Sequence, residues 1–306
     1  MDSVLKKVIN DIFTNLNKIV KNVEPIIGHD SVNKIFIVTT DKEKLIIRLN
    51  NDRGFDEFIK EKWCIEKASA KGIPGPTVIN VGEIEDHSYM VLSFLEGVIG
   101  SQSTIDTELV WEIIGKYTRL IHSIPVSGFG LSSSELIDTH SNSSNSKWRN
   151  FVAYNIQSLS PGDKLIELGA LNEEKSGRVK KLFQELIKKQ FNFGLNHGDI
   201  SLKNVMISDE DKVSIFDWGS AEAQIVPYHD IDVILEDSLK DNSSEFKSFL
   251  KGYGLSDKNY ADMEEDLHSL MLLRAIDKLR WAIDKHAIDI PAFTTRVKEF
   301  YKMKFK

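Results

Sequence analysis

The sequence predicts an α+β protein, with a β-rich first part and a mainly helical remainder. Short runs of β-branched and other apolar residues, separated by polar turns, recur up to residue 97. From about residue 104 onward, apolar residues recur instead at the spacing of a helical face. The chain has 306 residues, 41% of them hydrophobic, which is enough for one large globular unit or for two lobes.

The composition restricts the compartment and the partners. The net charge of −7 provides no overall basic field that would attract nucleic acid or an anionic membrane. The single cysteine, Cys64, excludes an internal disulfide and lies in a helical pattern, where we expect it to pack as a small apolar residue. No apolar run reaches membrane-spanning length, and the N-terminus lacks the apolar core of a signal peptide. We therefore expect a soluble, cytoplasmic protein, and a monomer.

The first part begins with a helical pattern and a hairpin. Apolar positions recur with helical spacing over residues 4–20. Two β-prone runs follow, over 28–38 and 44–49, and the polar stretch 39–43 between them is suited to a turn. We expect these two runs to pair with each other.

A second helix and two further strands complete this part. Residues 54–71 have a helical apolar face, and Gly72–Ile73–Pro74 is a typical stop signal. Strands are predicted over 78–83 and 88–97, with a turn at 85–87.

The remainder is predicted as helices that flank one short hairpin. A strong apolar face ends at His122, which we expect to cap or pack rather than to catalyse. The segment 126–147 is rich in Ser, Asn and Gly and is interpreted as a connector, the alternative being a substrate-side loop. The helices are expected near 104–122, 147–158, 172–190 and, as a series, 243–301. The expected core of that series is Leu267, Leu270, Met271, Leu273, Ile276, Leu279 and Trp281.

A cluster of polar residues surrounds the short hairpin. The stretch Asn196–His197–Gly198–Asp199 precedes it, Asn204 opens its first strand, 205–207, and Asp217 follows its second strand, 213–216. Asn204 and Asp217 can therefore point into one cleft. Phosphoryl transfer from a nucleotide needs a carboxylate that accepts or orients the proton of the attacking hydroxyl, and an Asn oxygen and a second Asp that hold Mg²⁺. The alternative is a hairpin whose Asp and Asn residues only form turns.

The order of these residues is similar to that of a known family. The pattern H-G-D-x-x-x-x-N at 197–204, followed by D-W-G at 217–219, resembles the catalytic and metal-binding loops of the aminoglycoside phosphotransferase family, which has the protein-kinase-like fold. The resemblance covers most of the chain, residues 25–235. It implies a bilobal fold, with a small β-rich nucleotide-binding lobe over 1–97 and a larger, mainly helical lobe over 98–306 that holds the catalytic loop and the substrate site.

The resemblance also implies the catalytic residues. By their place in the two motifs, these are Asp199, Asn204 and Asp217, and the Mg²⁺ ligands among them are Asn204 and Asp217.

The phosphate-binding turn is implied in the same way. In kinase-like folds the first hairpin covers the nucleotide, and the turn beside it touches phosphate. Here the turn has one glycine, Gly28, rather than a glycine-rich loop, and Ser31 and Asn33 are the candidate phosphate neighbours.

Arg48 departs from the protein-kinase pattern, in which a lysine at this strand position holds the α- and β-phosphates. Some family members have arginine there, and its planar fork can bind phosphate. The alternative is an exposed arginine on a strand edge. The expected partner of Arg48 is Glu61, because a carboxylate within the apolar face of the next helix needs a buried cation. Glu57, which lies off that face, is the second choice.

The stretch Ser93–Phe94–Leu95–Glu96–Gly97 resembles the hinge of the family, whose backbone groups bind the adenine edge. By composition alone it is a strand end with a glycine exit, which is the alternative interpretation. Met206 and Phe216 are further candidate nucleotide neighbours implied by the resemblance.

The region after the second motif is rich in acidic residues. The family commonly has an aspartate here that supports the catalytic loop, and Asp230 matches it, although the preceding Gly-Asp is absent. A carboxylate-lined cleft would attract a cationic amino sugar or a choline-like amine, whereas acidic residues on helices mostly solvate the surface. No single acid is assigned to the substrate. The acids are Asp230, Asp232, Glu236, Asp237, Asp241, Glu245, Asp257, Asp262, Glu264, Glu265 and Asp266.

Three classes of function compete. The first is a small-molecule hydroxyl kinase that uses ATP or GTP with Mg²⁺, and its acceptor is an aminoglycoside-type antibiotic or, alternatively, a choline-, homoserine- or sugar-type metabolite. A protein kinase is disfavoured, because Ser201 stands where that class has a lysine and no A-P-E-like segment follows the second motif. A nucleotide-binding scaffold without turnover is disfavoured too, because it has no need of Asp199, Asn204 and Asp217 together.

Overall fold

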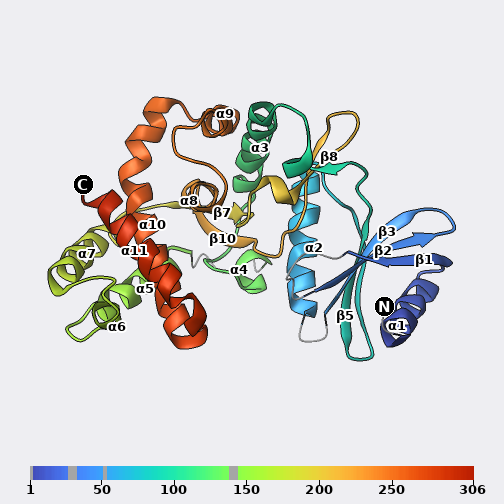
Figure 1. Cartoon of the computed structure of the whole chain (residues 1–306), viewed down its shortest axis with the longest axis horizontal. Coiled ribbons are helices and arrows are strands. Elements are labelled where there is room, and N and C mark those ends of the chain that lie inside the picture. The colour runs from blue at the N-terminus through green and yellow to red at the C-terminus, as the bar shows by residue number, and fades with distance from the viewer. Residues whose placement is uncertain (1–2, 27–32, 51–53, 138–143) are drawn as a thin grey trace.

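The computed structural model describes residues 3–26, 33–50, 54–137 and 144–306 (Figure 1). A five-stranded antiparallel sheet near the N-terminus is followed by a mainly helical region, so the predicted α+β class is confirmed. The strand order is β1–β2–β3–β5–β4. The strands are β1 (Val20–Pro25), β2 (Lys34–Thr40), β3 (Lys44–Asn50), β4 (Val78–Ile84) and β5 (His87–Ser93).

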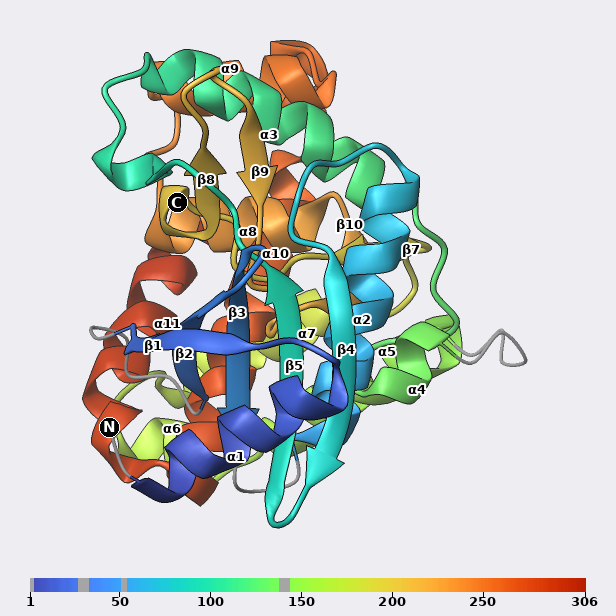
Figure 2. The ribbon, with the colours of Figure 1, turned by 90° about the vertical axis from the view of Figure 1, so that its right-hand side faces the viewer.

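Two helices pack against this sheet, α1 (Ser3–Asn15) and α2 (Phe55–Ala70). Figure 2 shows α1 lying across the strands. The β3 side chains that share a core with α1 are Leu45, Ile47 and Leu49. Successive residues of a strand point to opposite faces, so Arg48 points to the face on which α2 lies. Cys64 of α2 is buried in the core, as predicted.

The first predicted helix is shorter than expected. It ends at Asn15 rather than at residue 20, because Asn17 adopts the left-handed conformation (φ 56°) and the amide of Lys18 donates to the carbonyl oxygen of Phe13. The chain then enters β1 at Val20, a strand that the sequence pattern did not reveal. The predicted hairpin of the next two strands is confirmed as β2 and β3.

The second part consists of helices around two small sheets. The main helices are α3 (Thr107–His122), α5 (Ser144–Ser158), α7 (Glu173–Leu186), α8 (Tyr228–Asp237), α9 (Ser244–Tyr253), α10 (Asp257–Lys285) and α11 (Ile290–Lys304). The short helices are α4 (Ser133–Ile137), α6 (Lys164–Glu167), η1 (Gly100–Gln102), η2 (Leu202–Asn204) and η3 (Ala287–Asp289). One sheet pairs β7 (Asn192–Asn196) with β10 (Glu222–Val226), and the other has the order β6 (Val98–Ile99), β8 (Val205–Ile207) and β9 (Val213–Ile215).

Most predicted helices of this part are confirmed, with three differences. The helix predicted over 172–190 ends at Leu186, β7 and β10 were not predicted, and the segment 126–147 contains α4. In the C-terminal series Trp281 was wrongly placed in the core, since it is 51% exposed. Trp281 follows the buried Leu279 by two residues, which is about 200° around a helix, so the two side chains point to opposite faces.

Within the described residues, no helix combines the length and the apolar character needed to cross a bilayer.

Candidate active site

Two loop segments from the second part of the chain meet at one pocket. The first, residues 197–204, leaves β7 and ends in η2, and the second, residues 217–219, follows β9. They are joined directly, because the amide of Phe216 donates to the carbonyl oxygen of Asn204 at 3.1 Å. Asp199, Asn204 and Asp217 all line a pocket of about 800 Å³. The structure thus brings the three predicted catalytic side chains together.

Asn204 fixes the carboxylate of Asp199. Its side-chain Nδ2 donates to Oδ2 of Asp199 at 2.8 Å and to the backbone carbonyl oxygen of the same residue at 2.9 Å. Both bonds use the amide nitrogen, and the Oδ1 atom of Asn204 accepts no hydrogen bond from any described residue. An amide oxygen that remains available is a suitable ligand for a hard cation such as Mg²⁺.

The acid–base character of Asp199 follows from its half-buried position. Burial raises the pKa of its carboxyl group, and the hydrogen bond from Asn204 offsets this only in part. A carboxylate with a raised pKa accepts a proton more readily than an ordinary aspartate does.

Arg48 connects the sheet to the second segment. Its Nη1 pairs with Oε2 of Glu61, so the predicted ion pair is confirmed, and its Nη2 lies 3.9 Å from Oδ1 of Asp217. The alternative of an exposed edge arginine is wrong, because β3 lies between β2 and β5 and the Arg48 side chain is only 12% exposed. Burial raises the pKa of Glu61, and the charge of Arg48 opposes that rise. Glu57 is exposed and plays no part in the pair.

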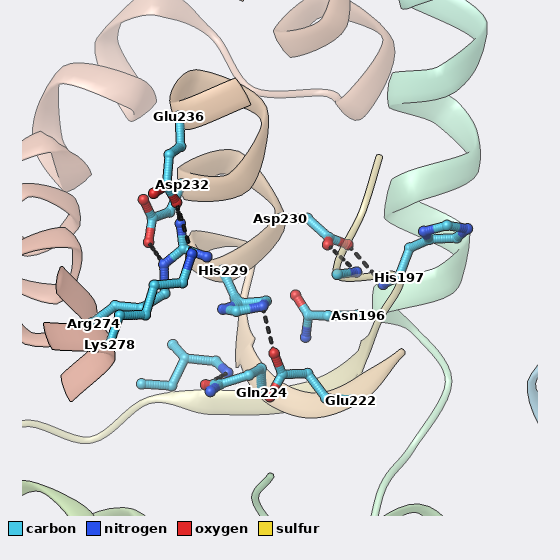
Figure 3. A network of polar contacts seen from close by, with 12 residues as sticks. Asn196, His197, Glu222, Gln224, His229, Asp230, Asp232, Glu236, Arg274 and Lys278 are labelled. Carbon is cyan, nitrogen blue, oxygen red and sulfur yellow. Dashed lines mark hydrogen bonds and ion pairs between the residues drawn. The ribbon is translucent and has the colours of Figure 1, made fainter. Parts of the chain in front are cut away.

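Asp230 binds the backbone of the first segment, as Figure 3 shows. Its buried carboxylate accepts hydrogen bonds from the amides of Gly198 (2.8 Å) and His197 (3.1 Å), and Nε2 of His122 lies 3.0 Å away. Burial alone would raise the pKa of Asp230, but His122 and the backbone amides outweigh it and lower the pKa to about 2. The support predicted for Asp230 is therefore confirmed by its contacts.

His122 is buried, as expected for a packing residue, and it has a specific partner on each side. Its Nδ1 lies 2.9 Å from the hydroxyl of Tyr253, and its Nε2 faces Asp230. With Nε2 protonated, the Tyr253 hydroxyl donates to Nδ1 and the ring donates to Asp230. A chain of hydrogen bonds thus runs from α9 through α3 and α8 to the backbone next to Asp199.

His197 joins the two segments. It is fully buried, its Nε2 lies 3.2 Å from the carbonyl oxygen of Phe216, and its ring centroid is 4.7 Å from that of Trp218. Burial lowers the pKa of His197, which favours a neutral ring that donates through Nε2. The sequence patterns assigned His197 no separate role.

The predicted nucleotide neighbours have mixed outcomes. Gly28 and Ser31 lie outside the described residues. Asn33 accepts a hydrogen bond from Nδ2 of Asn50 at 3.1 Å. Met206 pairs with Ile99 across β8 and β6, and the half-buried Phe216 contributes both of its backbone groups to the site.

The strand predicted over 88–97 is shorter than expected, because β5 ends at Ser93, where the predicted hinge stretch begins. The backbone amide and the Oγ atom of Ser93 both bond to Thr77, at 2.9 and 2.8 Å. Phe94 and Leu95 follow, both half-buried, and Lys44 lies 5.4 Å from the Phe94 ring centroid. Gly97 has φ 136°, and a Cβ there would lie 2.2 Å from the carbonyl oxygen of Ile207, so only glycine fits.

The model of the phosphotransferase enzyme family matches residues 24–265. The chain belongs to the phosphotransferase enzyme family. The enzyme class predicted from the sequence, a small-molecule kinase, is confirmed by this membership. A probable ketoamine kinase of Staphylococcus aureus is 27% identical over 68% of this chain and 73% of its own.

Two solved structures have a similar shape. Aminoglycoside phosphotransferase APH(4)-Ia, solved as a thermostable mutant with ADP and hygromycin B, has a TM-score of 0.67, with 17% identity and 97% of each chain covered. A putative fructosamine-3-kinase from Haemophilus somnus has a TM-score of 0.62, with 14% identity and 97% of each chain covered. These likenesses show the fold, and the predicted kinase-like fold is confirmed.

The acidic residues of this phosphotransferase fall into two groups. Asp237 and Glu245 line the pocket beside Asp199. Asp232 and Glu236 instead form a buried cluster with Arg274, drawn in Figure 3. The expectation that acids here mostly solvate the surface is wrong for this second group. Arg274 was missed because it lies about forty residues downstream on α10, with no local pattern that links it to α8.

Proposed function

We propose that this phosphotransferase transfers the γ-phosphoryl group of ATP or GTP to a hydroxyl of a small amine-bearing sugar, an aminoglycoside-type antibiotic in the first place. The observation that carries the proposal is the pocket of about 800 Å³ next to Asp199, whose lining includes the carboxylates of Asp199, Asp217, Asp237 and Glu245. The volume suits a sugar-sized ligand, and the carboxylates favour a ligand with protonated amines.

In this proposal Asp199 accepts or orients the proton of the attacking hydroxyl. Its raised pKa and its fixed carboxylate, held by Asn204, both suit that role. The amide oxygen of Asn204 and the half-exposed carboxylate of Asp217 would hold Mg²⁺. Two protein oxygens fit a metal that is held mainly by nucleotide phosphates and water. When bound, the metal would neutralise the charge of the phosphates during transfer.

The remaining residues would bind the nucleotide. Arg48, oriented by Glu61, lies on the sheet face that turns to Asp217, where it can hold phosphate. The backbone of Phe94 and Leu95 would bind the adenine or guanine edge, because Ser93 already bonds to Thr77. The proposed boundary between the lobes is residue 97, because the next residue, Val98, begins β6, which pairs with β8 rather than with the large sheet.

A second acceptor class is favoured by the sequence relative. The probable ketoamine kinase is 27% identical to this chain, a higher identity than that of the solved structures described above. A ketoamine carries a protonated amine and sugar hydroxyls, as an aminoglycoside does, so the same carboxylate-lined pocket would suit it. The two classes differ in size and in the number of amines, which a substrate panel can separate.

The test is nucleotide consumption that depends on Mg²⁺. ATP and GTP are supplied separately with hygromycin B, spectinomycin, other aminoglycosides, a fructosamine, choline and a simple neutral sugar, and Asp199→Asn serves as the inactive control. We expect stimulation by an amine-bearing sugar and none by the neutral sugar. Stimulation by choline alone would contradict the proposed acceptor, and wild type that consumes no nucleotide with any acceptor would contradict the proposed reaction.

A further inference from the structure

Lys60 is a buried charge that the proposed mechanism leaves unused. It precedes Glu61 on α2, is 6% exposed, and donates from its ammonium group to the carbonyl oxygen of Gly219 at 3.0 Å. It forms no ion pair with any carboxylate of the described residues. A buried ammonium is costly unless its surroundings compensate for the lost water, so its position calls for a physical reason.

The backbone conformation of Asp217, two residues before Gly219, provides that reason. Its φ of 63° lies in the left-handed region, which is strained for a residue other than glycine and persists only where neighbouring contacts impose it. On the N-terminal side, the adjacent Phe216 is held by both backbone groups, through Asn204 and His197. On the C-terminal side, the bond from Lys60 holds Gly219.

The charges around Gly219 agree with this arrangement. A Cβ atom at Gly219 would lie 3.6 Å from Oδ1 of Asp217 and 3.6 Å from Oε1 of Glu61, so both carboxylates lie next to the residue that Lys60 binds. The positive charge of Lys60 also favours the ionised form of Glu61 by lowering its pKa, against the effect of burial. The ammonium thus stabilises the Glu61 carboxylate and the backbone carbonyl of Gly219, which lies beside the Asp217 carboxylate.

We propose that Lys60 is a positioning residue that holds Asp217 in its metal-binding conformation. The inference rests on the proposed function, in which Asp217 binds Mg²⁺. α2 then acts on the nucleotide site in two ways, through Glu61 on Arg48 and through Lys60 on Gly219. A displacement of α2 would therefore loosen the phosphate-binding arginine and the metal-binding carboxylate together.

The test compares Lys60→Met with Lys62→Met and Lys60→Arg. Lys62 lies on the same helix, but its side chain is 43% exposed and pairs with Glu66, so Lys62→Met is a matched control. Amide hydrogen exchange over residues 213–221 is measured in the free protein, and the binding of AMP-PNP is measured by calorimetry at several Mg²⁺ concentrations. We expect Lys60→Met to exchange about tenfold faster there and to need about tenfold more Mg²⁺ for half-saturation, a factor that corresponds to about 1.4 kcal/mol. Lys60→Arg, which keeps a charged donor, restores both values, and Lys62→Met changes neither.

The two readouts separate the inference from the proposed function. Unchanged exchange in Lys60→Met, with the fold intact by circular dichroism, would overturn the inference whatever the nucleotide does. Faster exchange with unchanged Mg²⁺ dependence would also overturn it, because Lys60 would then serve only the backbone. Faster exchange in a protein whose wild type binds neither AMP-PNP nor a GTP analogue would support the anchor at Gly219 and overturn the proposed function instead.

Discussion

Asp199 and Asp230 are close to the same loop, yet their surroundings drive their protonation in opposite directions. Asp230 is the more deeply buried, but backbone amides and His122 lower its pKa to about 2. Asp199 is only half-buried, and its pKa is raised, because the hydrogen bond from Asn204 offsets burial only in part. The number of donors that face a carboxylate, more than its depth, decides which form is favoured.

The opposite pKa changes distinguish an aspartate that supports a loop from one that is suited to proton transfer. A carboxylate that stays ionised at every working pH can hold the backbone of a loop, as Asp230 does. A carboxylate that is less well compensated can take up a proton during a reaction, at some cost to the stability of the folded protein. Substitutions at the two positions should therefore have different effects on turnover and on stability.

The largest effect is expected for Asp199→Asn. It removes the proton acceptor while leaving an acceptor oxygen for Asn204, so turnover should fall by about 10²–10⁴-fold with little change in nucleotide binding. Because the charged form of Asp199 is disfavoured by burial, the same change should raise the midpoint of thermal unfolding slightly. Steady-state kinetics and calorimetry on one preparation measure both effects. Full activity in Asp199→Asn would remove this residue from the mechanism.

Asp230→Asn should show the opposite combination. Removing the charge leaves His122 and two backbone amides without their ionic acceptor in a fully buried site, which costs about 3–5 kcal/mol of unfolding free energy. Activity should fall together with stability, because Gly198 loses its support next to Asp199. Urea unfolding monitored by tryptophan fluorescence measures the cost. A loss no larger than that of the exposed Asp262→Asn would show that Asp230 is not the support that its contacts indicate.

These two aspartates also show how far the sequence could lead. Both were predicted from short motifs, and the pair of Arg48 with Glu61 followed from one charged residue on a strand and one on an apolar helix face. Lys60 and Arg274 were not predicted, since each finds its partner across a long sequence separation through packing that no local pattern encodes. The strands β7 and β10 were not predicted for a related reason. Each is five residues long, and each forms a strand because it pairs with the other.

The pH dependence of stability distinguishes the two carboxylates further. The folded-state pKa of Asp230 is about 2, below the ordinary value of 3.8, so its stabilising contribution is complete above about pH 4 and is lost as the pH falls towards 2. A pKa lowered from 3.8 to about 2 corresponds to about 2 kcal/mol of unfolding free energy. The difference in unfolding free energy between wild type and Asp230→Asn should therefore shrink as the pH falls below 4. Urea titrations from pH 6 down to the lowest pH at which both proteins are folded measure it, and a constant difference would contradict the lowered pKa.

The smallest effect is expected at Asp237, an exposed carboxylate that lines the acceptor pocket. It lacks the burial of Asp199 and the donors of Asp230, so its contribution is that of a screened surface charge, below about 1 kcal/mol. Asp237→Asn should raise the KM for a cationic acceptor by about two- to fivefold, leave kcat and the nucleotide KM unchanged, and lose its effect at high salt, because counter-ions screen the attraction. Asp262→Asn removes the same charge from an exposed position that does not line the pocket and serves as the matched control. An equal rise in KM for both variants would mean that the pocket attracts its ligand through overall charge, whereas a rise confined to Asp237→Asn would place the cation of the acceptor within reach of the C-terminal end of α8.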